Sequence, residues 1–232
     1  TDKFSYEEVV AEMEKILKRK KTLIILGACI AIFCVAFGTV SIAQNYYKSS
    51  SSDKKEKAVY QMAEKEKERL KDKGTYNPKD HIEKEDLAEK AENVADVFDM
   101  SVSEAEKRIT ENSVEKKALY LAAEDAGITV SEQDVTDEIE KIKAALATDP
   151  EGKKELEAEI AGMGMDEEEY WNFLRPQYKS NMIVNKYLNK MYEEKCKEEK
   201  IDLYSEECME KRKEWRDSIT QEAIKKYNVK VE

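Results

Sequence analysis

Residues 118–146 read ALYLAAEDAGITVSEQDVTDEIEKIKAAL, a stretch that contains the end of one helix and the start of the next. Gly127 fits the left-handed position after a helix, and Ile128 can fold back onto the last turn. Ser131 and Asp134 have the spacing of a helix N-cap. Apolar residues then recur every three or four positions, at Val135, Ile139, Ile142 and Leu146. The stretch therefore predicts two helices joined by a short turn.

Composition extends this prediction to the rest of the chain. Only 7 Gly and 3 Pro occur in 232 residues, where average usage would give about 28 in total. Few backbone breakers among many Glu, Lys and Ala residues favour helices almost throughout, so we expect an all-α protein. This expectation excludes β-sandwiches, barrels and glycine-rich nucleotide-binding sheets. The formal net charge of −11 argues against a nucleic-acid partner, which would need a basic face.

Further helices are marked by the same start and stop signals. Caps begin helices at Ser101, Asp149, Asp166 and Ser205, and the helix after Asp166 contains Pro176, which should kink it. A charged helix before Gly74 has few apolar positions, so we expect it to be a stalk packed lightly on the rest. A short extended tail follows Asn228.

One segment departs from the polar average of the chain. Residues 22–43, TLIILGACIAIFCVAFGTVSIA, contain no charged residue and would span about 33 Å as a helix, enough to cross a bilayer core. A buried core helix is the alternative, although such helices are shorter and rarely apolar on every side. Residues 18–21, KRKK, precede the segment, so the positive-inside rule places residues 1–21 in the cytoplasm and the rest outside. Ser41-Ile42-Ala43 also allows a cleaved signal peptide, but the length of the run favours an uncleaved signal-anchor.

The expected organisation follows from these signals. It comprises a cytoplasmic amphipathic stub (residues 1–21), a transmembrane signal-anchor in contact with the lipid bilayer (22–43), a polar tether (44–57), a charged stalk with the first helices (58–99), and a helical domain (100–232).

Catalytic and metal-binding patterns are poorly represented. The chain has a single histidine, His81, and lacks the His and Cys clusters of common zinc sites. It has no phosphate-binding glycine loop and no set of Ser, His and acid typical of a hydrolase. We therefore expect neither an enzyme nor a metal or other cofactor. Cys196 and Cys208 lie near the end of one helix and the start of the next, and a disulfide between them is left open.

Apolar and aromatic residues concentrate in one stretch of 20 residues. Helical spacing favours core positions for most of them, but YWNFL at 170–174 covers more than one helix face. An exposed groove lined by Met and aromatic residues would suit an adaptable binder of apolar polypeptide. The candidate polypeptide-binding residues are Met163, Met165, Tyr170, Trp171, Phe173, Leu174, Tyr178 and Met182.

The order of several segments resembles a known family. These segments are AAEDAGI (122–128), TVSEQDV (129–135), IEKIK (139–143) and GMDEEEYW (164–171), with AIKKYNVKV (223–231) near the end. Together they resemble the N-terminal chaperone domain of SurA and of PrsA-type foldases. The resemblance implies a module of a bacterial cytoplasmic membrane protein that lies outside the cytoplasm and holds unfolded or secreted polypeptides.

One departure from this family pattern concerns activity. Family members often carry a parvulin prolyl isomerase domain before the closing helix, but only about ten residues separate Lys195 from Ser205 here. The sequence therefore predicts a membrane-anchored, chaperone-like protein without prolyl isomerase activity. The alternative is a docking module for one specific partner in a membrane complex.

Overall fold

The computed structural model describes residues 50–71, 73 and 76–232. Within them the chain forms seven α-helices and no strand longer than a single bridge, so the described part is all-α as expected. The helices are α3 (Ser52–Leu70), α4 (Lys84–Phe98), α5 (Val102–Asp125), α6 (Glu132–Leu146), α7 (Pro150–Met163), α8 (Glu167–Glu199) and α9 (Glu206–Tyr227).

The predicted helix boundaries are confirmed by the caps. The Ser131 hydroxyl accepts a hydrogen bond from the Asp134 backbone N–H, and the Asp134 carboxylate accepts one from the Ser131 N–H, which completes a capping box. Gly127 has a φ of 67°, and the Ile128 N–H donates to the carbonyl of Ala123 at 2.9 Å. Asp166 begins α8 with a second capping box, and the helix continues through Pro176 to Glu199.

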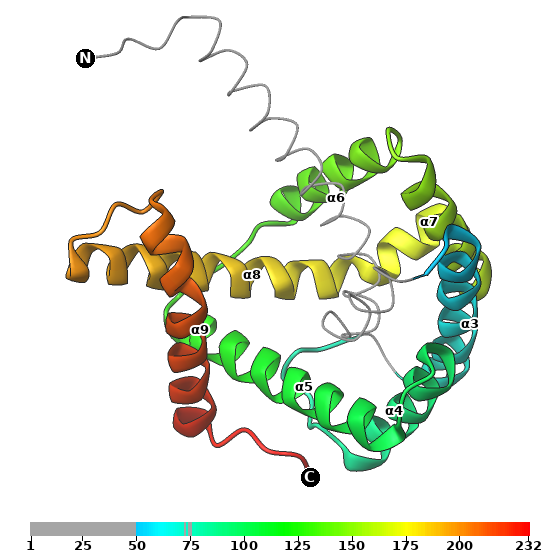
Figure 1. The fold of residues 1–232 in the computed structure, drawn as a ribbon, viewed down its shortest axis with the longest axis horizontal. Coiled ribbons are helices and arrows are strands. Elements are labelled where there is room, and N and C mark those ends of the chain that lie inside the picture. The colour runs from blue at the N-terminus through cyan, green and yellow to red at the C-terminus, as the bar shows by residue number, and fades with distance from the viewer. Residues whose placement is uncertain (1–49, 72, 74–75) are drawn as a thin grey trace, which may run out of the picture.

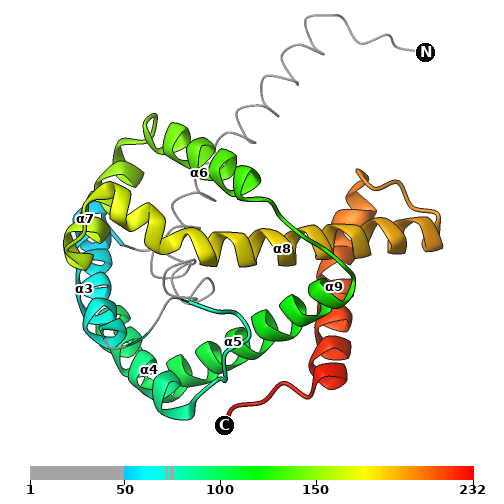
Figure 2. The ribbon, with the colours of Figure 1, turned by 180° about the vertical axis from the view of Figure 1, so that it is seen from behind.

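The other helices are arranged around α8. Figure 1 shows α8 running across the molecule, bent in its first half, with α6 on one side and α5 on the other. Helices α7, α3 and α4 close one end, and α9 crosses α5 and α8 near the other end; Figure 2 shows the same arrangement from behind. Helix α8 packs against α5, α6, α7 and α9, so several of its faces are covered.

The expected stalk differs from the structure. Helix α3 begins at Ser52, inside the predicted tether, and packs along α7 with Val59, Met62 and Ala63 buried. Close approach is possible because α7 carries Gly162, where a Cβ atom would lie 2.6 Å from the Tyr60 carbonyl oxygen. The few apolar residues of α3 share one face, so a low apolar content did not mean light packing.

One apolar core spans the predicted boundary near residue 100. Buried side chains of α3 and α4 belong to the same cluster as those of α5, α6, α7 and α8. A smaller cluster joins the end of α8 to the start of α9, around Leu188, Tyr192 and Trp215. The buried residues of α3 and α4 therefore contribute to the same core as those of the later helices.

The expected extended tail pairs with a distant segment. Ile82 and Val231 form a parallel bridge, in which the Glu232 N–H donates to the Ile82 carbonyl at 2.9 Å. The Lys84 N–H donates to the Glu232 carbonyl at 3.0 Å. The tail thus holds the linker between α3 and α4 against the body of the domain.

The predicted stub and signal-anchor, residues 1–21 and 22–43, lie outside the described residues. In the part of the chain that the structure describes, no helix combines the length and apolar character needed to cross a membrane.

Candidate functional site

The eight predicted polypeptide-binding residues do not together line one open groove. Five of them are buried, namely Met163, Tyr170, Trp171, Leu174 and Tyr178. The other three, Met165, Phe173 and Met182, are half-buried and pack against the same core. The physical reason is that α8 has neighbours on several sides, so a run of apolar residues that covers more than one helix face is still enclosed. Binding of a polypeptide by any of the eight stays a prediction.

The junction of α7 and α8 instead forms a closed aromatic core. The rings of Tyr170 and Trp171 meet edge to face with centroids 5.6 Å apart. The Trp171 indole N–H donates to Glu167, and the Lys143 ammonium lies 5.6 Å from the Trp171 ring centroid. We call this closed cluster, with Leu174 and Met163, the α7–α8 junction.

A buried carboxyl group faces this junction. Glu159 of α7 is 1% exposed and lies beside the Tyr170 hydroxyl. Burial raises the pKa of Glu159 to about 8, an increase that the contact with Tyr170 partly opposes. Burial also raises the pKa of the Tyr170 phenol, with Glu159 adding to the increase. Glu159 is therefore mostly protonated at neutral pH. The neutral acid is compatible with its buried surroundings.

An open pocket of about 500 Å³ lies beside α8. Its walls come from α3, the linker residues 73 and 76–83, α4, α5 and α8. We call it the central pocket. Phe173 is the one predicted binding residue that lines it. The apolar and aromatic lining residues are Leu70, Tyr76, Pro78, Ile82, Leu87, Ile109 and Phe173.

The linker forms one wall of the central pocket. Tyr76 is 40% exposed, and its phenol lies near the Ser180 hydroxyl of α8. Burial raises the pKa of the Tyr76 phenol, and the nearby Ser180 hydroxyl partly offsets this increase. The Lys117 ammonium of α5 donates to the Asp80 carbonyl at 2.9 Å. These contacts hold the linker between α5 and α8.

Paired charges form a second wall. Arg69 of α3 donates through Nε to Glu66 at 2.8 Å and also contacts Asp86 of α4. Asp86 pairs in turn with Lys73, while Lys90 lies 3.9 Å from Glu66. Burial lowers the pKa of Lys90, and the nearby Glu66 carboxylate opposes that decrease. Most charges on this wall are thus compensated within the protein.

Amide side chains complete the lining on the opposite side. Asn112 of α5 and both Gln177 and Asn181 of α8 border the pocket. A carboxamide both donates and accepts hydrogen bonds, so Gln177 and Asn181 can pair with polar groups of a bound molecule. Ser113 lies next to Asn112 on the same wall.

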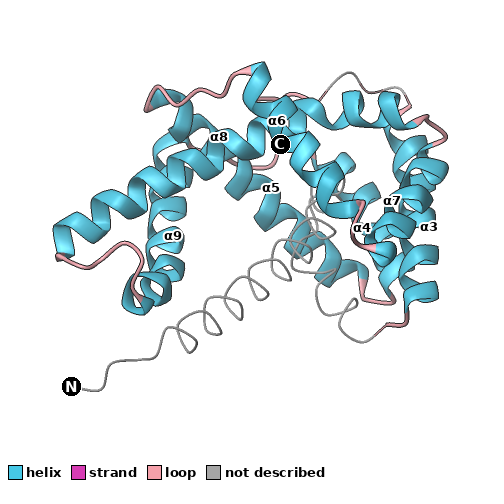
Figure 3. Cartoon of the chain, turned by 90° about the horizontal axis from the view of Figure 1, so that it is seen from above, coloured by secondary structure: helices cyan, strands magenta, loops and turns pink. Residues whose placement is uncertain are grey.

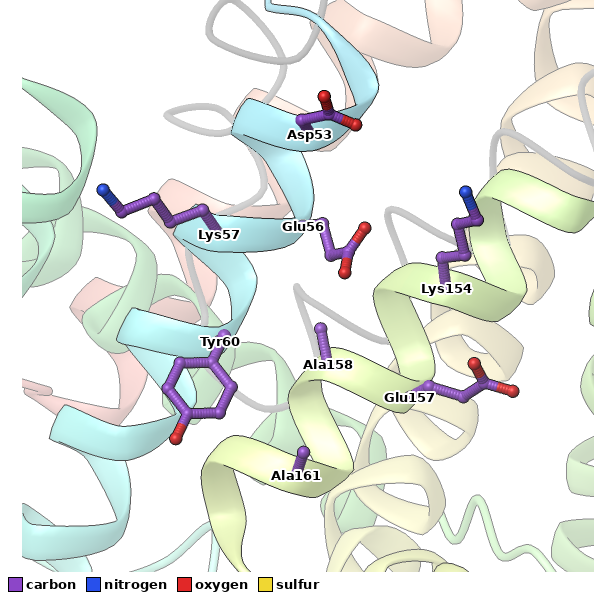
Figure 4. Close-up of a pocket in the computed structure, with 8 residues that line it drawn as sticks. All are labelled: Asp53, Glu56, Lys57, Tyr60, Lys154, Glu157, Ala158 and Ala161. Carbon is purple, nitrogen blue, oxygen red and sulfur yellow. The ribbon is translucent and has the colours of Figure 1, made fainter.

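A second hollow, of about 730 Å³, lies on the outside between α3 and α7. Figure 4 shows Ala158 and Ala161 between the two helices and Glu56 pointing into the space, whereas Lys57 and Glu157 point away. Tyr60 is its one aromatic lining residue, and the remaining lining residues are charged or Ala. Although larger, this groove offers little apolar surface, so the central pocket is the better candidate site.

The cysteine pair is brought together at the far end of α8. The Sγ atoms of Cys196 and Cys208 lie 2.6 Å apart, and both residues are buried. The single histidine, His81, contacts the Glu232 carboxylate through Nδ1 at 2.7 Å on the surface. Across residues 50–71, 73 and 76–232, no three His, Cys, Asp or Glu side chains are grouped as a metal site would require.

Sequence reasoning missed most of the central pocket. Its charged residues follow the pattern of solvated helix faces, and the linker looks like an ordinary turn after Asn77-Pro78. One signal was available: Ile82 and Leu87 flank a cap and are apolar, which suggests that this linker packs on something.

Comparison with known protein families gives a match. The family described as the SurA-like N-terminal domain matches residues 13–188. No curated protein and no solved structure matches the chain.

Proposed function

The chain belongs to the SurA-like N-terminal domain family, and from this membership we propose that it is a membrane-anchored chaperone-like protein that holds unfolded or exported polypeptides. The central pocket is the proposed binding surface, and residues 22–43 are the proposed anchor. The folded domain lies outside the cytoplasmic membrane of a bacterium in this proposal. Prolyl isomerase activity is not part of it.

The observation that carries the proposal is the mixed character of the central pocket. Its accessible aromatic side chains, Tyr76 and Phe173, can cover the apolar residues of a client segment. Its amide side chains can satisfy the client's backbone, which would otherwise lose hydrogen bonds to water. A lining of this kind fits polypeptide in general and does not require one particular sequence.

The pocket is less suited to catalysis. Arg69 pairs with both Glu66 and Asp86 at the wall, and Lys73 and Lys90 supply further positive charge beside these carboxylates. They are therefore occupied in holding α3 against α4 and are not poised to exchange protons with a ligand. This arrangement supports binding without a reaction.

The test is to block the pocket without unfolding the domain. Ser113→Trp places a large ring into the pocket from α5, while Ser103→Trp adds the same ring at an exposed position of the same helix. The full chain in detergent should suppress aggregation of an unfolded client. Ser113→Trp should weaken this suppression several-fold, and Ser103→Trp should leave it unchanged. Lack of suppression by the unmodified chain at several-fold molar excess would falsify the proposal.

Crosslinking in cells separates the two functions that remain. A reactive group placed at Gln177 should capture many different polypeptides if the protein is a chaperone. Capture of one partner in a fixed ratio would instead identify a specific docking module.

A further inference from the structure

A second chemical feature lies away from the central pocket, at the tip formed by the end of α8 and the start of α9. Figure 3 shows these two helix ends projecting from the body of the domain, joined by the loop of residues 200–205. Cys196 is 2% exposed and Cys208 is 0% exposed. Their Sγ atoms are 2.6 Å apart, so a covalent bond needs only a small further approach, to about 2.05 Å.

Backbone capping fixes the position of each cysteine. Lys200 adopts a left-handed conformation with φ 58°, and the Ile201 N–H donates to the Cys196 carbonyl at 2.9 Å. At the start of α9, the Cys208 N–H donates to the Ser205 hydroxyl at 3.1 Å. Each cap sets the direction of the helix at the position of its cysteine. The juxtaposition of the two thiols is therefore built into the turn.

Contacts between the helices hold the tip closed on either side of the pair. The Trp215 indole N–H of α9 donates to Glu199 of α8 at 3.1 Å, and Lys211 donates to the same carboxylate at 2.5 Å. Arg212 of α9 lies over the ring of Tyr192 of α8. The two helix ends thus remain in register around the two sulfur atoms.

The surroundings do not favour other uses of the thiols. A metal site needs three or four ligands, and the described residues contain no group of three or more His, Cys, Asp or Glu side chains that could hold an ion. Burial raises the pKa of Cys196 to about 11, with Cys208 adding to the increase, which disfavours the reactive thiolate. Neither property suits a catalytic cysteine.

We propose that Cys196 and Cys208 form an intramolecular disulfide that ties the start of α9 to the end of α8. In this step each thiol gives up its proton, the two sulfur atoms bond, and two electrons pass to a small-molecule or protein disulfide. That oxidant is reduced to two thiols. Attack through a mixed disulfide, followed by displacement by the second cysteine, accomplishes this exchange. The bond forms before the sulfur atoms are buried.

Peptide mapping of the full chain tests the bond directly. The protein is unfolded, refolded in a buffer of oxidised and reduced glutathione, alkylated and digested without reductant. A linked peptide joining Cys196 to Cys208 in monomeric protein is expected, with loss of both alkylation sites. Two alkylated or glutathione-modified cysteines, or a link between two chains, would overturn the proposal.

A second measurement, amide hydrogen exchange, tests the bond without depending on how much of the protein refolds. Amide hydrogen exchange of residues 206–215 should be about tenfold slower in the oxidised than in the reduced protein. In a Cys196→Ala/Cys208→Ala variant, reductant should have no effect on exchange in this segment. An equal effect of reductant on the variant would show that the bond is not responsible. Because the oxidant is supplied in the buffer, this result does not depend on the proposed polypeptide binding.

Discussion

The α7–α8 junction and the central pocket both contain aromatic and apolar side chains of α8, yet one is closed and the other is open. Trp171 is buried at the junction, whereas Phe173, two positions later, is half-buried and lines the pocket. The junction lies where α6 and α7 pack directly on α8. The pocket remains where residues of the linker, together with α3, α4 and α5, face α8. Neighbouring elements therefore decide which apolar residues remain accessible.

The largest expected effect is at the junction. Trp171→Ala removes a large buried side chain and should lower the free energy of unfolding by about 3–5 kcal/mol. Phe173→Ala is the matched change at the central pocket. It should lower the free energy of unfolding by less than Trp171→Ala does, and it should weaken client binding. Urea denaturation of both variants, with a client-binding assay on each, measures the contrast. Equal losses of stability would show that the two positions are equally enclosed.

The next effect concerns the buried acid beside the junction. The pKa of Glu159 is raised from 4.5 to about 8 in the folded state, so folding favours the protonated acid. Its contribution to stability is complete below pH 4.5 and is lost as the pH rises towards 8. Glu159→Gln should therefore increase the free energy of unfolding by about 3 kcal/mol at pH 7. Little change is expected at pH 4.

Denaturation of the wild type and variant at both pH values measures this difference. The related variant Glu155→Gln is the control, because burial raises the pKa of that partly buried acid to about 7. It should show the same sign with a smaller gain. A Glu159→Gln gain that is as large at pH 4 as at pH 7 would mean that packing, and not charge, is responsible.

The smallest effect on stability is expected in the pocket itself. Gln177→Ala removes a lining amide and should change the free energy of unfolding by no more than about 0.5 kcal/mol. Client binding should nevertheless become a few-fold weaker, because peptide groups lose a hydrogen-bonding partner. Asn189→Ala, an exposed amide on the same helix, should alter neither quantity. If both variants bind equally well, the amides do not contribute to recognition.

Local signals in the sequence predicted the helices well because caps act over a few residues. Ser131 with Asp134, Asp166 and Gly127 each determine a boundary through their own hydrogen bonds or dihedral angles. The packing of α3 was not predictable in the same way. It depends on Gly162, about a hundred residues later, which permits the two helices to approach.

The candidate site was predicted less well for a related reason. The aromatic run at 170–174 was recognised, but its exposure depends on where α6 and α7 lie. The pocket wall made by Arg69, Glu66 and Asp86 looks in the sequence like ordinary charged helix surface. Its role is visible only when α3 and α4 lie side by side and their charges neutralise one another.

The bridge between Ile82 and Val231 has a consequence for the order in which the protein assembles. The chain is synthesised from its N-terminus, so the linker and most helices emerge well before the residue that completes the bridge. Until Val231 is available, the linker wall lacks its partner on one side. Joining Ile82 to Val231 closes a long loop of chain. This closure has an entropic cost that contacts between residues close in sequence avoid. A newly made chain therefore passes through an interval in which Ile82 has not yet paired with Val231 and this wall of the pocket is incomplete.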